Sequence, residues 1–405
     1  METANDNRAL SGYQRYMLVL LAMTGCFFNA MPHMCLPVLF KEIADDLDLS
    51  LVQIGVVWGM VPLAGLFVIL IGGLLADRFG TRRVLIIGCF LSGLAGMSRA
   101  FSDSFTTLSA TMFLFGIIQV LTAPAQIRAC GVWFAGRHLG LANGVLSTSI
   151  GFGFLLSSVI SATVLSPLLG GWRNVLIAYG ILSIGISILW FFSRNDPVHR
   201  ESHSGSETTA SFKESLLSVL HIRNIWVLGV VVMLQVGCVN GMLGYLPTYL
   251  KDIGWNPVAA DNAVSVFHGC STLFTVPVVL LSNRLGSRKI VMFVAILMTA
   301  VGAGILAFNN GAGVWVAMVI AGIIRDGFMA VQMTMLLEMK GVRIQNAGAA
   351  IGLTNTITRI GEIFSPPVGN SLANTNPRYA FLMWAGMSVV SLFGFLFFKK
   401  DRETV

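Results

Sequence analysis

The chain is a succession of long apolar runs separated by short polar segments. A helix that spans a bilayer needs about 20 mostly apolar residues. Twelve runs meet this requirement, at 16–40, 54–76, 84–101, 107–130, 141–165, 173–192, 224–247, 262–282, 290–308, 313–338, 346–369 and 378–398. Glycine and proline inside several runs are typical of helices that pack against one another in lipid. The pattern therefore predicts an all-α polytopic membrane protein with twelve transmembrane helices.

The composition excludes most other classes of protein. Charged residues make up 11% of the 405 residues and apolar residues 55%, whereas soluble domains contain about 25% charged residues. A disordered chain and a disulfide scaffold do not fit these figures. The first apolar run is too long for the core of a cleavable signal peptide, so we expect it to remain as a span.

The basic residues predict the orientation. If both termini lie in the cytoplasm, 18 of the 26 Lys and Arg residues fall in inner segments, four in outer segments and four within spans. This asymmetry follows the positive-inside rule. The net charge of +7 thus reflects topology and calls for no nucleic-acid partner. We expect a multi-pass protein of the plasma (inner) membrane, in contact with the lipid bilayer, with cytoplasmic termini.

One long polar stretch, from Ser193 to Arg223, has six predicted spans before it and six after it. It predicts an N-terminal six-helix bundle (1–193), a cytoplasmic linker (194–223) and a C-terminal six-helix bundle (224–405). Within the linker, a short surface helix is expected at 212–220.

The two halves also repeat each other in sequence. Four segments of the first half recur in the same order in the second: 36–43 with 246–253, 77–83 with 283–289, 116–119 with 322–325, and 140–144 with 348–352. Four ordered matches indicate a duplicated six-helix unit, arranged as a 6+6 pseudo-symmetric repeat.

The loop after the second run carries a longer motif, Gly73-x-x-x-Asp77-Arg78-Phe79-Gly80-x-Arg82-Arg83. With the six-plus-six pattern, it resembles the major facilitator superfamily over nearly the whole chain. The resemblance implies secondary transport without ATP, alternating access around a central site near the midplane, and a monomer. It also implies an inner gate; the residues to which it assigns this gating role are Asp77, Arg78, Arg82 and Arg83.

That gate has two features of its own in this sequence. The second copy of the motif has Asn283 in place of Asp77, so we expect a weaker contact there. Arg128, at the inner end of the run 107–130, is interpreted as a further gating or interface residue. The alternative is that the arginines of the motif are only positive-inside anchors.

Charged residues in the middle of spans are costly and are functional candidates by default. Arg325 and Asp326 lie in the run 313–338, and Arg359 and Glu362 in the next one. An arginine binds a carboxylate through two parallel donors, so both arginines are predicted to bind substrate. A carboxylate in a site of low dielectric constant can take up a proton, so Glu362 or Asp326 is predicted to couple protons.

An alternative interpretation of these pairs is that they are neutralised and fix helix packing. Arg325 and Asp326 are adjacent, so their side chains are expected to point apart, with Asp326 against a neighbouring helix. Arg359 and Glu362 are three residues apart and are expected to share a helix face.

Asn355, four residues before Arg359, shares its side of the same span. Polar residues on other spans that line the cavity in this superfamily complete the candidate substrate site: Gln119, His33, Asn29, Asn240 and Tyr245. His33 has a second interpretation as a hydrogen-bonded helix contact, and Tyr245 as an outer gate. Arg99, at the end of the run 84–101, is expected to extend its side chain to the interface. Because no histidine pair has a metal-binding spacing, no metal or cofactor is expected.

The sequence as a whole predicts a secondary active transporter for a small organic anion of mono- or dicarboxylate type, coupled to protons or to a counter-anion. Its short loops and the Trp133-Phe134 pair resemble prokaryotic organic-anion members of the superfamily. The alternative is a proton antiporter that exports amphipathic or cationic compounds. Such an exporter would need an accessible acid without an arginine partner, and the first half offers none beyond Asp77. An enzyme is not expected, since no nucleophile–base or metal constellation is present.

Overall fold

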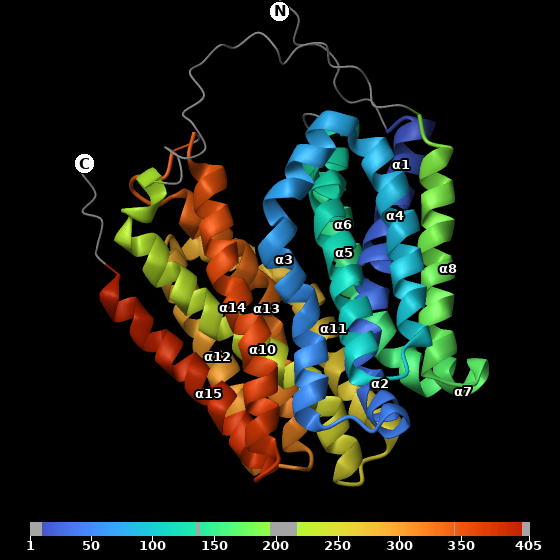
Figure 1. Cartoon of the computed structure of the whole chain (residues 1–405). Helices are drawn as coiled ribbons and strands as arrows, with labels where there is room; N and C mark the ends of the chain where they lie inside the picture. Colours follow the sequence, from blue (N-terminus) through green and yellow to red (C-terminus); the bar gives the residue numbers. More distant parts are fainter. Residues whose placement is uncertain (1–9, 135–137, 195–216, 344, 399–405) are drawn as a thin grey trace, which may run out of the picture.

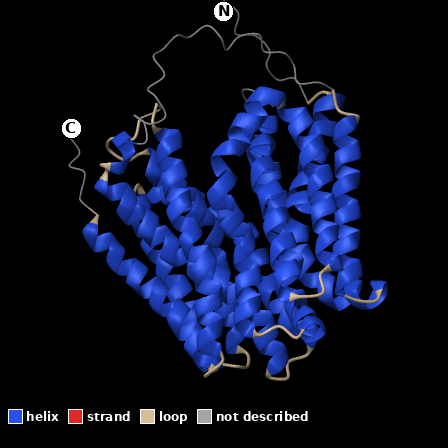
Figure 2. Cartoon of the chain, viewed as in Figure 1, coloured by secondary structure: helices blue, strands red, loops and turns tan. Residues whose placement is uncertain are grey.

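The computed structural model describes residues 10–134, 138–194, 217–343 and 345–398. Within these ranges the secondary structure is entirely helical (Figure 2). Most of the predicted linker and of its helix at 212–220 lies outside the described residues, although residues 217–220 are helical. The predicted all-α class is confirmed.

The first half of the chain contains the shorter and more interrupted helices. They are α1 (Gly12–Met23), a π-helical segment (Thr24–Ala30), α2 (Met31–Leu47), α3 (Leu51–Phe79), α4 (Thr81–Ser98), α5 (Phe105–Trp133), α6 (Leu139–Ile160), α7 (Ser166–Leu169) and α8 (Trp172–Phe191). The second half consists of α10 (Arg223–Asp252), α11 (Pro257–Leu285), α12 (Arg288–Phe308), α13 (Gly313–Leu337), α14 (Ala347–Ala373) and α15 (Pro377–Gly394).

Among the described residues, ten helical segments, from Gly12–Leu47 to Gly313–Leu337, are long and apolar enough to cross a membrane. The chain is therefore a multi-pass membrane protein. The last two predicted apolar runs are helical as well, as α14 and α15. The described helices match the predicted runs in order and differ from them mainly at their ends. For example, α2 ends at Leu47 where the run ends at 40, and α10 ends at Asp252 where the run ends at 247.

Local sequence explains where several helices begin and end. At the start of α3, Ser50 Oγ accepts from the backbone N–H of Gln53, and the side chain of Gln53 accepts from the N–H of Ser50. This reciprocal capping satisfies two N–H groups that have no helical partner. Gly80 and Gly286 occupy equivalent positions of the repeat and have φ angles of 81° and 62°. Because glycine adopts positive φ without strain, the chain can turn sharply at both positions.

The helices form two groups that correspond to the two halves of the sequence (Figure 1). In the first half α3 packs on α5 and α4 on α8; in the second, α10 packs on α14, α11 on α13 and α12 on α15. The main pairs that join the groups are α3 with α14, α6 with α11, and α2 with α10, and α3 also contacts α10.

The two groups meet over part of their length. We call the side of the molecule with the turns at Gly80 and Gly286 the Gly80 end, and the opposite side, with the turn at Gly254, the Gly254 end. Contacts between the groups run from the Gly254 end to the middle and include Lys41 with Asp252, Lys251 with Val38, Leu51 with Asn370, Gly55 with Pro367, and Gly65 with Arg359. Toward the Gly80 end the ribbons of the two groups diverge (Figure 1).

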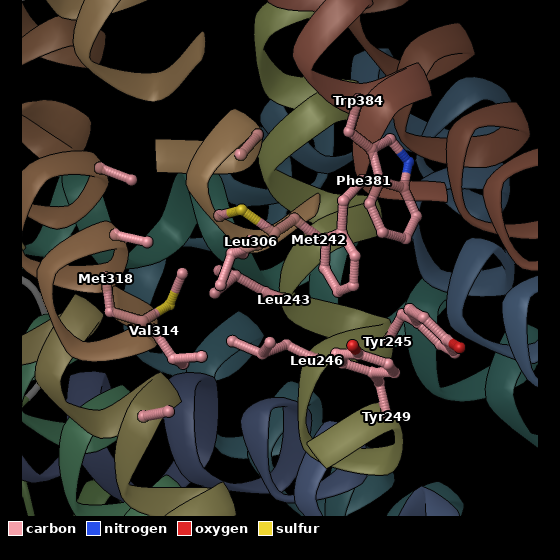
Figure 3. Packing of buried hydrophobic residues seen from close by; sticks show 14 of the residues in the cluster. Met242, Leu243, Tyr245, Leu246, Tyr249, Leu306, Val314, Met318, Phe381 and Trp384 are labelled. Carbon is pink, nitrogen blue, oxygen red and sulfur yellow. The ribbon is translucent and has the colours of Figure 1, made fainter. Parts of the chain in front are cut away.

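A large aromatic and aliphatic cluster packs α10 against its neighbours near the Gly254 end (Figure 3). Its labelled members are Met242, Leu243, Tyr245, Leu246, Tyr249, Leu306, Val314, Met318, Phe381 and Trp384. The rings of Phe381 and Trp384 meet edge to face, with centroids 5.5 Å apart, an arrangement that aromatic pairs favour. The cluster holds α10, α12, α13 and α15 together as one body.

Candidate functional site

Arg359 and Glu362 form an ion pair near the middle of α14. Arg359 Nη1 lies 3.0 Å from Glu362 Oε2, and the two side chains are 27% and 20% exposed. The spacing of three residues brings both onto one face of the helix, as predicted. An added Cβ at Gly65 would lie 3.1 Å from Arg359 Nε, so Arg359 lies against α3 of the first half. The pair therefore lies at the boundary between the halves.

A second pair lies on α13. Arg325 Nη1 bonds to Asp326 Oδ1, and the side chains are 32% and 25% exposed. The expectation that these neighbours point apart is wrong, because the long arginine side chain bends back to the adjacent carboxylate. The expected contact of Asp326 with another helix is present: its backbone N–H donates to Ser271 Oγ of α11 at 3.2 Å.

A chain of contacts links the first half to the ion pair of α14. The His33 ring stacks on the Trp58 ring with centroids 4.7 Å apart. Trp58 Nε1 donates to the backbone carbonyl of Asn240 at 3.1 Å, and Asn240 Nδ2 donates to the carbonyl of Glu362 at 3.1 Å. Three predicted residues are thereby connected through Trp58, which the sequence interpretation missed. A buried indole N–H usually has a hydrogen-bond partner. The tryptophan in this span could therefore have indicated a polar contact.

The second histidine, His268 of α11, lies at the boundary between the halves. It is 1% exposed, its Nε2 has no hydrogen-bond partner among the described residues, and its ring packs on Phe154 of the first half. The same helix reaches the pair on α13 through Ser271, which accepts from the backbone N–H of Asp326. His268 therefore lies on a helix that contacts both the first half and the α13 pair.

The predicted amides of the first half are already engaged in hydrogen bonds. Asn29 Nδ2 donates to Gln126 Oε1 at 3.1 Å, and Gln119 Nε2 donates to the backbone carbonyl of Phe28 at 2.8 Å. One amide donor remains unused, since Gln126 Nε2 has no hydrogen-bond partner among the described residues. These contacts fix the amides in place before any ligand arrives.

Two other predicted residues, Tyr245 and Asn355, are not part of the ion pairs on α13 and α14. Tyr245 is 3% exposed and belongs to the aromatic cluster, next to Tyr249, Phe381 and Trp384. Asn355 is partly exposed on α14, one turn before Arg359. Of these two residues, Asn355 lies on the same face of α14 as Arg359 and Glu362, and Tyr245 does not lie on α14.

The residues of the predicted gate lie at the Gly80 end. The side chain of Asp77 is outside the described part of the structure. Arg78 and Arg83 are exposed. Arg82 donates to the backbone carbonyls of Trp190 and Phe191 at the end of α8, within the same half.

The remaining interfacial arginines differ from each other. Arg128 is half-buried on α5. Arg99 was expected to reach the interface, and this expectation is wrong: its side chain is fully buried. The guanidinium donates to the carbonyl of Pro32 at 2.9 Å and lies 4.0 Å from the centre of the Phe115 ring. These contacts replace water around the charge. In the described ranges, no three His, Cys, Asp or Glu side chains lie together as a metal site would require.

The chain is similar in sequence to transporters of bacterial origin. It is 25% identical over 214 residues to the probable galactarate/D-glucarate transporter GarP of Escherichia coli K12, a match that covers 50% of this chain and 46% of that protein. It is 26% identical over 156 residues to the probable sulfoacetate transporter SauU of Cupriavidus necator, covering 38% and 36%. The matches thus span about half the length of these curated relatives, or less.

The fold is shared with a solved structure, that of a mutant of the nucleoside transporter NupG. The TM-score is 0.79 with 17% sequence identity, and the match covers 95% of this chain and 99% of that one. The sequence profile of the Major Facilitator Superfamily matches residues 22–269 and 250–405. The two matches together include nearly all the described residues. The chain therefore belongs to the major facilitator superfamily, a family of membrane transporters and not of enzymes.

Proposed function

We propose that this protein is a secondary active transporter for small organic anions that carry two acidic groups, such as sugar diacids. The observation that carries the proposal is the pair of mid-membrane arginines, Arg325 and Arg359. Each keeps about a third of its side chain exposed. Charge exposed to lipid at this depth is expensive, so the exposed guanidinium groups belong to a space between the halves.

The relatives support the same class of substrate. Galactarate, glucarate and sulfoacetate each carry two anionic groups, and the names of two relatives contain these compounds. Two arginines on neighbouring helices match two acidic groups, because each guanidinium can hold one of them by parallel hydrogen bonds. Asn355, His33, Asn29, Gln119 and Asn240 would then bind the hydroxyl groups between the acids, and Tyr245 would support this wall from the aromatic cluster.

Each arginine is now held by its own carboxylate, and this suggests how transport is coupled. A proton taken up by Glu362 would neutralise that carboxylate and release Arg359 for the substrate. Asp326 would do the same for Arg325. Exchange for a second anion would use the same arginines without proton uptake. In the first route the proton promotes binding of the substrate, whereas in the second the two anions compete for the same arginines.

Transport by alternating access fits the way the halves meet. We propose twelve spans in two six-helix bundles, 1–193 and 224–405, joined by the linker 194–223, with both termini in the cytoplasm. In this orientation the Gly80 end is cytoplasmic and the contacts at the Gly254 end close the outer side. Asp77, Arg78, Arg82, Arg83 and Arg128 would close the inner side in the opposite state. We take the transporter to act as a monomer.

A thermal-shift panel on the purified protein tests this function. The panel contains galactarate and sulfoacetate, the monoacid gluconate, the neutral polyol galactitol, and a lipophilic cation. A ligand that binds the folded state raises its melting temperature. We expect the two diacids to stabilise the protein most, gluconate less, and galactitol and the cation not at all. Stabilisation by the cation alone would overturn the proposal and favour an exporter of cationic compounds.

A further inference from the structure

The first span is broken in the middle. A π-helical segment, Thr24–Ala30, separates α1 from α2, and Pro32 follows it. The N–H of Met31 bonds to the carbonyl of Cys26, five residues back. Because proline has no N–H, the carbonyl of Phe28 loses the donor that an α-helix would provide. The break lies between Asn29 and His33, two candidate substrate residues.

Side chains from three other parts of the first half bind this broken segment. Three backbone carbonyls accept from distant side chains: Phe28 from Gln119 at 2.8 Å, Met31 from Ser157 at 3.0 Å, and Pro32 from Arg99 at 2.9 Å. The Pro32 carbonyl also accepts from the nearby Cys35 Sγ at 3.5 Å. The three distant donors are at most 7% exposed. They fix the segment from α5, α6 and the end of α4, and with it the side chains of Asn29 and His33.

Arg99 differs from the other two donors because it is charged. Its Nε donates to the carbonyl of Gly96 at 3.1 Å, and its Nη2 has no hydrogen-bond partner. No carboxylate within salt-bridge distance of it occurs in the described residues. A buried charge without a counter-charge is costly, and a neutral donor would bind the Pro32 carbonyl as well. The charge is held close to His33, because Nη1 donates to the carbonyl of the preceding residue, Pro32.

We propose that Arg99 is a positioning residue for the substrate anion. It holds Pro32, and with it the neighbouring His33 ring that stacks on Trp58, and it adds a third positive charge that favours dianions over monoanions. The proposal rests on the proposed function, because it assumes an anion at the centre. Arg99 does not touch the anion; it acts through the first span and through its field.

The test compares affinities for galactarate and gluconate, six-carbon sugar acids with two carboxylates and one carboxylate respectively, which also differ in configuration at one carbon; the ratio of the two affinities in each variant is compared with the ratio in the wild type. We expect Arg99→Met to weaken galactarate binding about tenfold more than gluconate binding, the order expected when one nearby unit charge is removed. Arg99→Lys keeps the charge and should keep the ratio of the two affinities. Ser157→Ala also keeps the charge and should weaken both ligands equally.

An unchanged affinity ratio in Arg99→Met, with wild-type protein binding both ligands, would overturn the role of the Arg99 charge in favouring dianions. Unchanged affinities for both ligands would overturn the positioning role as well, and either result leaves the transport function intact. If the wild type binds neither ligand, the proposed function itself is wrong and the role of Arg99 falls with it. Arg99→Gln is the second variant. It keeps an N–H donor near Pro32 without the charge, so a stable fold and a changed ratio are expected together.

Discussion

Lys41 and Lys251 occupy equivalent positions of the two halves, and each contacts the opposite half. Lys41 Nζ lies 3.1 Å from the Asp252 carboxylate, and Lys251 Nζ donates to the backbone carbonyl of Val38 at 2.7 Å. Their surroundings differ. Lys41 and Asp252 are both 39% exposed, whereas Asp261, which lies 2.8 Å from Lys251, is fully buried. The repeat thus places two similar lysines in unequal electrostatic environments.

This inequality predicts unequal losses of stability. Lys251→Met leaves the buried carboxylate of Asp261 without this partner, which costs about 3–5 kcal/mol. Lys41→Met removes two exposed ion pairs, with Asp252 and Asp45, each worth about 0.2–1 kcal/mol. Melting of both variants in detergent checks this. The double variant Lys251→Met with Asp261→Leu is the control and should recover most of the loss; equal melting temperatures of the two single variants would contradict the prediction.

The contact between α3 and α14 predicts that Gly55 is needed for transport. A Cβ at Gly55 would lie 2.7 Å from the backbone of Pro367, and a proline backbone in a packed helix cannot move away cheaply. Overpacking of this kind costs about 1–3 kcal/mol, so Gly55→Ala should slow uptake into proteoliposomes about tenfold by opposing closure. Gly304→Ala, where nothing lies within 4 Å of the new Cβ, is the matched control. Equal uptake by both variants would show that the close approach has no role in closure.

The aromatic cluster predicts a stability effect independent of transport chemistry. Trp384 is fully buried and touches Tyr245 and Phe381. Removal of such a side chain costs about 3–5 kcal/mol, so Trp384→Ala should lower the melting temperature sharply. Trp384→Phe preserves one ring and should lose much less. The idea fails if the two variants melt at the same temperature.

The ion pair on α14 predicts separable effects on binding and coupling. Glu362→Gln leaves Arg359 permanently free of a carboxylate partner three residues away. We expect it to bind galactarate at least as well as the wild type but to lose proton-driven accumulation. Proton flux and substrate counterflow in proteoliposomes measure the two separately. Asp326→Asn is the parallel variant; retention of full coupling by Glu362→Gln would assign the proton to another group.

The helices could be predicted because apolar runs depend on local sequence alone. The break in the first span could not. A π-helical turn at Thr24–Ala30 is stabilised by donors such as Gln119 and Arg99 that are distant in sequence. Arg99 near a helix end resembled an interfacial anchor, and only the fold shows that Pro32 and Phe115 enclose it.

The candidate site also contains residues that the sequence predicts and residues that it does not. Arg359 and Glu362 are visible in the sequence because charge within an apolar run is rare, and helix geometry alone predicts that they meet. Trp58 differs from the other apolar residues of its span only in its indole N–H, which does not reveal its partner. Its contacts with His33 and Asn240 depend on how α3 packs against two other helices.

The most direct test of the central claim is the affinity of purified protein for galactarate, measured by calorimetry in wild type, Arg325→Ala, Arg359→Ala and Arg284→Ala. Arg284 is exposed at the Gly80 end and serves as the control. A hydrogen bond to a charged group contributes about 1.5–3 kcal/mol, so each central variant should lose about tenfold or more in affinity while Arg284→Ala binds like the wild type. Wild-type affinity in both central variants would contradict the account, because the arginines would then have no part in binding the anion.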